Sequence, residues 1–117
     1  MTEVVIGDIT WFRGDSYPAE IHIVNTNTGD ALDITGYTFK LTVDTNKNPA
    51  DDSTKLFELL GNIDPDPTTG KVAFTPTPEN NDLVPKNYYY DIEMTDPMGY
   101  VRTIAKNKWI IVQDITK

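Results

Sequence analysis

The sequence predicts an all-β protein: an antiparallel β-sandwich with immunoglobulin-like or Greek-key connections, about eight strands and one short helical turn. Three observations predict this fold. Apolar residues recur with a period of two in several segments, turn-forming residues cluster between these segments, and no long stretch has the period of an amphipathic helix. With 117 residues the chain is long enough for one domain with a real core, so we expect a single sandwich over residues 1–117.

Strands are predicted wherever apolar and polar residues alternate. The clearest case is 37–44, where Tyr, Phe, Leu and Val alternate with Thr, Lys, Thr and Asp. Shorter segments of the same kind are 21–23, 72–74 and 88–94. Clusters of Asn, Asp, Gly, Pro and Thr separate them and predict chain reversals at 26–30, 48–52, 64–70 and 96–99.

Two local features refine this arrangement. Pro97 presets φ for a turn and Gly99 accepts a positive φ, so a tight hairpin is expected to join 88–95 to 100–105. The one place that favours a helix begins at Thr77, which can cap a single turn over 79–83.

Composition excludes several classes of partner. Ten Lys and Arg against eighteen Asp and Glu give a net charge of −8 without any basic block, which disfavours nucleic acid. There is no cysteine, so neither disulfides nor thiol chemistry is expected. No window approaches the roughly 18 apolar residues of a membrane span, and the N-terminal residues lack the pattern of a signal peptide. These features predict a protein made in a cytoplasm that does not act on a membrane.

Nucleophilic hydrolysis by a Ser-His-acid arrangement needs a histidine, and the chain has only His22. Ile21 and Ile23 flank it on a predicted strand, so its side chain is expected to face solvent. One histidine and no cysteine leave no zinc site of the usual composition.

Two further segments resemble known binding loops but lack residues that are essential for binding. Residues 44–48 open like a calcium loop, but Pro49 stands where glycine is needed and Lys55 where a bidentate glutamate is needed. Gly70-Lys71 resembles the end of a phosphate loop, but Val72 replaces the hydroxyl residue that binds the metal. We therefore expect no catalytic residue, no cofactor, no metal site and no enzymatic activity, unless two acids share a cleft and one has a raised pKa.

Aromatic residues supply the candidate contact residues. In the run of three tyrosines at 88–90, Tyr89 must face away from its neighbours, and an outward tyrosine suits a protein or sugar partner. Trp11 and Trp109 are the other two candidates for partner contact.

The tripeptide Arg13-Gly14-Asp15 is also found in cell-adhesion ligands, but three residues are a weak signal. It lies in the segment 12–18, which together with 32–41, 88–92 and 96–99 resembles the bacteriophage baseplate-upper-protein N-terminal-like domains. These are small β-sandwich modules of phage tail and baseplate proteins. In that pattern the tripeptide belongs to a passage between strands.

The resemblance implies a non-enzymatic structural protein of a phage particle, made in the host cytoplasm, located in the virion and bound to other virion proteins or to further copies of itself. Docking or edge pairing is expected at Thr2–Ile6 and at Trp109–Val112. The alternative is a carbohydrate-binding or host-receptor-binding module, with Tyr89 or Trp11 stacking on a sugar ring.

Overall fold

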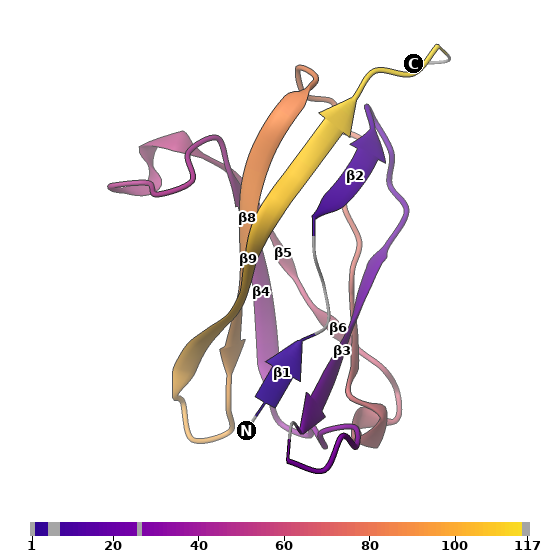
Figure 1. Ribbon diagram of the computed structural model, residues 1–117, viewed down its shortest axis with the longest axis vertical. Helices are drawn as coiled ribbons and strands as arrows, with labels where there is room; N and C mark the ends of the chain where they lie inside the picture. The colour runs from indigo at the N-terminus through magenta and orange to yellow at the C-terminus, as the bar shows by residue number, and fades with distance from the viewer. Residues whose placement is uncertain (1, 5–7, 26, 116–117) are drawn as a thin grey trace.

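The computed structural model describes residues 2–4, 8–25 and 27–115, which form two packed sheets (Figure 1). The prediction of a β-sandwich is confirmed. One sheet has the strand order β1-β3-β7-β6 and the other has the order β2-β9-β8-β4-β5. The nine strands of the described residues are β1 (Thr2–Val4), β2 (Ile9–Phe12), β3 (Ala19–Asn25), β4 (Thr38–Asp44), β5 (Lys55–Leu60), β6 (Asn62–Ile63), β7 (Lys71–Phe74), β8 (Lys86–Thr95) and β9 (Val101–Val112).

This topology is immunoglobulin-like. Strands β1, β3, β7 and β6 take the places of A, B, E and D in one sheet, and β9, β8 and β4 take those of G, F and C in the other. Tyr88, near the start of β8, donates its hydroxyl to the Val84 carbonyl at 2.6 Å. A tyrosine at this place that bonds back to the preceding corner is a hallmark of the same fold.

One strand pair differs from the all-antiparallel prediction. β2 pairs with β9 in parallel, from Ile9 opposite Trp109 to Phe12 opposite Val112. Strand direction depends on how the chain moves between the two sheets, and the period of apolar residues carries no information on it.

The core lies between the sheets and is built from the inward-facing residues of each strand. Trp109 is fully buried in it, with the ring centroids of Trp11, Phe57 and Tyr90 at 5.0, 5.8 and 6.0 Å from its own. Along β8, residues alternate between buried and half-buried from Tyr88 onward, as the sequence pattern predicted.

The predicted helical turn over 79–83 is wrong. The segment forms a hydrogen-bonded turn over 78–81, in which Thr77 and Asn80 exchange side-chain to backbone bonds. Asn81 is fully buried, and the Asp82 N–H donates to the Glu79 carbonyl at 3.2 Å, so the segment makes two successive turns and no helix. The two short 3-10 helices of the described residues lie elsewhere, at Asp52–Thr54 and Pro67–Thr69, each capped by the aspartate before it.

Candidate functional site

The Arg-Gly-Asp segment is held in the fold at several points. Arg13 Nε contacts Asp82 at 2.8 Å, and the Asp15 carboxylate accepts the Phe12 N–H at 2.9 Å. The buried Asn81 carbonyl accepts the Gly14 N–H, and its side chain donates to the Asp15 carbonyl. These contacts fix a passage between β2 and β3, so the tripeptide is not presented on a free loop.

Two of the three candidate contact residues lie in the core. Trp109 is fully buried and Trp11 is 5% exposed, so neither ring offers a face to a partner. The expectation that Trp11 and Trp109 contact a partner is corrected, because both side chains are buried in the core. Tyr89 lies on the outer face of the five-stranded sheet and is partly exposed, as expected.

Of the two segments expected to dock or to pair at an edge, one lies inside a sheet and the described part of the other lies at a sheet edge. Trp109–Val112 lies in β9 between β2 and β8, and the backbone of residues 109–111 is already paired on both sides. Thr2–Val4 pairs with β3 at the edge of the other sheet, and residues 5 and 6 lie outside the described residues. The edge of the five-stranded sheet opposite β2 is β5.

The outer face of the five-stranded sheet carries a charged groove of about 310 Å³, which the loop between β4 and β5 borders. Its lining combines lysines and acids from four strands and from the loop. The lysines are Lys40, Lys47, Lys55 and Lys106, and the acids are Asp44, Asp51, Asp52, Glu58, Asp91 and Glu93.

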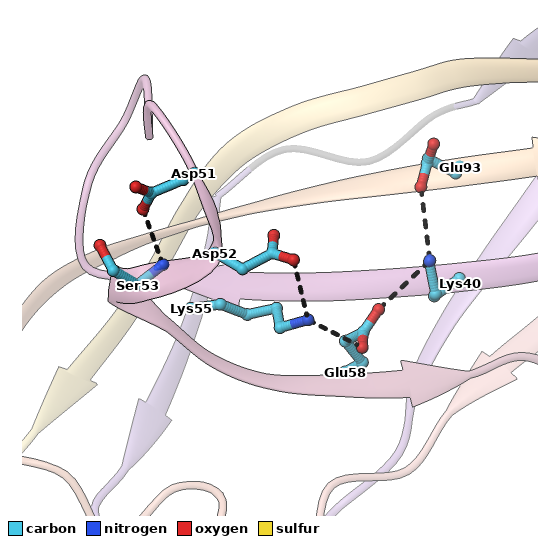
Figure 2. A network of polar contacts seen from close by, with 7 residues as sticks. All are labelled: Lys40, Asp51, Asp52, Ser53, Lys55, Glu58 and Glu93. Atoms are coloured by element: carbon cyan, nitrogen blue, oxygen red, sulfur yellow. Dashed lines mark hydrogen bonds and ion pairs between the residues drawn. The ribbon is translucent and has the colours of Figure 1, made fainter.

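Half of these ten charged residues form one network, which Figure 2 shows. Lys40 Nζ lies 3.2 Å from Glu58 and 3.7 Å from Glu93, and Lys55 Nζ lies 3.2 Å from Glu58 and 3.9 Å from Asp52. Bonds from Lys55 and Lys40 hold the pKa of Glu58 below its usual value. Because Lys40 joins Glu58 to Glu93, these carboxylates do not face each other across open space.

Asp91, on β8, differs from the other acids of the groove. Burial raises its pKa, and the nearby carboxylate of Glu93 adds to the effect, while Lys106 and Lys40 oppose it. Catalysis by acids requires two of them in one cleft, and one of the two must have a raised pKa. Asp91 meets the second requirement. Glu93 shares the groove, but it is paired with Lys40.

A second hollow of about 150 Å³ adjoins the groove around Tyr89. Lys47, Lys106 and Lys108 line it together with Asp8 and Asn107. Sequence reasoning identified Tyr89 but not the lysines, because they come from a loop and a strand that only the fold brings together. The signal available was the alternation Lys-Asn-Lys at 106–108, which places two lysines on one face of a strand.

The tip of the β8–β9 hairpin, Met98–Val101, is the second candidate surface. Met98 is 81% exposed, Tyr100 is 70% exposed and Val101 is 59% exposed. The sequence predicted the turn but not that three apolar side chains would be exposed there. The available signal was an apolar Met-Gly-Tyr-Val run inside a turn.

His22 lies outside both surfaces, on the other sheet. Its side chain is exposed, as predicted, and Nε2 donates to the Thr69 carbonyl at 2.7 Å. Within the described part of the chain, no group of three or more His, Cys, Asp or Glu residues is placed to hold a metal ion. Nor does that part contain a helix with the length and apolar character to span a bilayer.

Comparisons with known proteins show a likeness of fold and no match of sequence. No family model matches the chain, and no curated protein matches its sequence. The solved structure of CopC from Methylosinus trichosporium OB3b is similar with a TM-score of 0.57 and 7% identity, over 100% of this chain and 99% of that chain. At this identity the likeness shows the fold alone.

The prediction of a phage virion structural protein is contradicted by this comparison. The likeness, which extends over the whole chain, is to CopC and not to a virion protein. The motifs behind the prediction serve local turn geometry: Asp33 accepts two bonds from Thr35, and Asp96 accepts the N–H groups of the hairpin tip. Such turns suit many sandwiches. The resemblance to baseplate-upper-protein N-terminal-like domains stays a prediction.

Proposed function

We propose that this protein is a non-enzymatic protein-recognition module that binds through the tip of its β8–β9 hairpin. The observation that carries the proposal is the exposure of three large apolar side chains, Met98, Tyr100 and Val101, within four consecutive residues of the hairpin tip. Single exposed apolar residues are common, but a contiguous apolar cluster marks an interaction site. Tyrosine and methionine are also enriched at the buried centres of protein interfaces.

The backbone of the tip is fixed before any partner binds. The Asp96 carboxylate accepts the N–H groups of Met98 and Tyr100 at 2.9 and 3.0 Å. The Asp96 carbonyl accepts the Gly99 N–H, and the Asp96 N–H donates to the Tyr100 carbonyl. Gly99 has φ +90°, a conformation that favours glycine. Since the turn is already ordered, binding does not have to bear the entropy of ordering it.

The place of the tip in the fold supports the same function. It lies at the end of the sandwich opposite to the passage from β2 to β3 (Figure 1). In immunoglobulin variable domains the corresponding F–G loop is part of the antigen-binding end. This support is an analogy of fold, and the chemistry of the tip carries the proposal.

The partner is expected to be a protein with a concave apolar pocket, because the tip is convex and apolar. An anionic membrane surface is a poorer match, since the chain carries a net charge of −8. In the groove, Lys40 joins Glu58 to Glu93, and this pairing disfavours catalysis by these two acids.

The test is photo-cross-linking from the tip in the source cells. A photoreactive phenylalanine analogue replaces Tyr100 in one sample and Tyr17 in a control, since Tyr17 is 78% exposed and lies in the β2–β3 passage at the other end. A partner captured from position 100 and not from position 17 is then purified, and its affinity is measured directly.

The double variant Met98→Ser, Tyr100→Ser should weaken binding of the purified partner by about 30-fold or more, as expected for central interface residues. Tyr17→Ser should leave the affinity unchanged. Equal capture from both positions, or unchanged affinity in the tip variant, would refute the proposal.

A further inference from the structure

The hollow around Tyr89 has an unusual charge for this protein. Lys47, Lys106 and Lys108 line it against a single acid, Asp8, so its lining carries three positive charges and one negative charge. The whole chain carries a net charge of −8. Three of the ten Lys and Arg residues of an acidic protein therefore meet around one aromatic ring.

These lysines differ from the others on the same sheet face. Lys40 and Lys55 are both paired with Glu58. Within the residues that the structure describes, Lys47, Lys106 and Lys108 form no ion pair with a carboxylate. Lys106 lies near enough to Asp91 to lower that carboxyl's pKa, so part of its charge is offset. Much of the positive charge of the hollow remains available to a ligand.

The strand register places the cationic groups beside the ring. Lys108 on β9 is directly opposite Tyr89 on β8, and Lys106 is directly opposite Asp91. Residues opposite each other in antiparallel strands share one face, so Tyr89, Lys106 and Lys108 all project outward.

Local contacts hold the surroundings in place. Lys106 Nζ donates to the Asn48 side chain at 2.9 Å, which ties the β4–β5 loop to β9. The Asn48 N–H in turn donates to the Asn46 side chain, so the loop that carries Lys47 has fixed turns on either side of it. The Asp8 carboxylate accepts the Lys108 backbone N–H at 2.9 Å. Asp8, the one acid that lines the hollow, is therefore bonded to a backbone N–H.

We propose that this hollow binds a small ligand with an anionic substituent on a ring, with the ring on Tyr89 and the anion between Lys47, Lys106 and Lys108. The volume of 150 Å³ equals that of about five water molecules at ~30 Å³ each, which suits one small ring and its substituent. A long polyanion fits poorly, because the acidic remainder of the protein repels it.

The test uses heteronuclear NMR titrations of the isotope-labelled full chain. Benzoate, glucuronate and glucose 6-phosphate supply an anion on a ring, benzyl alcohol and glucose are neutral counterparts, and acetate and inorganic phosphate are anions without a ring. At least one ringed anion should shift the amide signals of Tyr89, Lys106 and Lys108, and should bind about tenfold or more tightly than its neutral and ringless counterparts.

Variants separate the charge from the ring. Lys108→Gln should weaken the binding of that ligand about threefold or more, while Lys71→Gln, a lysine on the other sheet, should not change it. Tyr89→Leu should weaken binding, and Tyr89→Phe should preserve it, because stacking needs only the ring.

The proposal is overturned if no ringed anion binds at millimolar concentration, or if Lys71→Gln weakens binding as much as Lys108→Gln does. Equal affinity for free phosphate or acetate would overturn the role of Tyr89. None of these results depends on the hairpin tip, so this site and the protein-binding tip succeed or fail separately.

Discussion

At the scale of single residues, the two buried tryptophans differ in their hydrogen bonding. Trp109 Nε1 donates to the Asn81 side-chain carbonyl at 2.8 Å. Trp11 Nε1 is buried and has no hydrogen-bond partner among the described residues. The rings lie in contact, with centroids 5.0 Å apart. A comparison of substitutions at the two tryptophans therefore separates the energy of one buried hydrogen bond from the energy of ring packing.

Replacing each tryptophan by phenylalanine removes a similar volume from the core. Trp109→Phe also leaves the Asn81 acceptor unsatisfied, which costs about 1–3 kcal/mol, whereas Trp11→Phe removes an N–H that made no bond. We expect Trp109→Phe to lower the free energy of unfolding by about 1–3 kcal/mol more than Trp11→Phe, measured by urea denaturation. Equal losses would contradict the importance of the Asn81 bond.

The raised pKa of Asp91 predicts that the variant Asp91→Asn is more stable than the parent protein at neutral pH but not in acid. Its pKa is raised in the folded protein by burial and by Glu93 and Asp44, against Lys106 and Lys40, so ionisation opposes folding. Its contribution to stability is therefore full below the unfolded pKa, near 3.8, and is lost as pH rises through the folded value. Asp91→Asn should unfold at higher urea than the parent protein at pH 7, and this gain should vanish near pH 3.

Asp33 provides the control of opposite sign. The Thr35 hydroxyl and N–H lower its pKa, so its carboxylate stabilises the fold above its unfolded pKa, and that stability is lost as pH falls through the folded value. Asp33→Asn should therefore lose stability at pH 7 and approach the parent protein in acid. If both variants changed stability in the same direction at pH 7, the assignment of Asp91 would be wrong.

At the scale of elements, the turns decide where the strands end. Substitution of the glycines in these turns measures how tightly each turn packs against its neighbours. Gly70, after the 3-10 helix Pro67–Thr69, has φ +69° and bonds through its carbonyl to the Ile23 N–H. A Cβ there would lie 2.4 Å from the Ile23 carbonyl oxygen. Gly29 has a similar φ of +76°, but a Cβ there would meet nothing within 4 Å.

Alanine at these two glycines shares the backbone strain but not the collision. Gly29→Ala should cost about 1 kcal/mol, the usual cost of the left-handed conformation. Gly70→Ala should cost about 3 kcal/mol or more, because backbone of β3 must move. Thermal unfolding of both variants measures the difference. A similar melting temperature for the two variants would show that the contact between Gly70 and β3 is loose.

The strands were predictable from the sequence because the two-residue period depends only on the pleat of the chain. β4 and β8 appear within a few residues of where alternation placed them. β5 was missed, because its apolar residues do not alternate and the register shifts near Asp44. The helical turn at 79–83 was wrong, and its residue Asn81 is bonded to Asp15 and Trp109, which are tertiary contacts that the local sequence does not report.

The candidate surfaces were only partly predictable for the same reason. Tyr89 faces outward because its neighbours in sequence face inward, which alternation alone predicts. Lys47 meets Lys106 and Lys108 only because a loop between other strands returns to β9, and sequence spacing does not report such a return. The burial of Trp11 depends on the pairing of β2 with β9, and sequence spacing does not predict that pairing either.

At the scale of the whole molecule, excess negative charge opposes folding. Eighteen acids and ten basic residues share a chain with a radius of gyration of 14.7 Å, so like charges lie within interaction range at low salt. The ion pairs of the outer face act in the opposite direction, but exposed pairs contribute only about 0–1 kcal/mol each. The net repulsion should therefore dominate the response to salt.

Raising NaCl from about 0.01 M to about 0.15 M shortens the Debye length from roughly 30 Å to roughly 8 Å. We expect the melting temperature to rise by roughly 2–4 °C, equivalent to less than about 1 kcal/mol for a domain of this size. Calorimetry at constant pH measures this change. A fall in melting temperature would mean that the ion-pair network outweighs the repulsion.

The parallel pairing of β2 with β9 has a mechanical consequence. β1 begins at one end of the sandwich and β9 finishes at the other (Figure 1). If the chain is stretched between these ends, β2 and β9 are dragged past each other lengthwise, so the bonds from Ile9 opposite Trp109 to Phe12 opposite Val112 carry the load together. Strands loaded in this way must rupture all at once instead of unzipping one bond at a time, and the sandwich should resist tension accordingly.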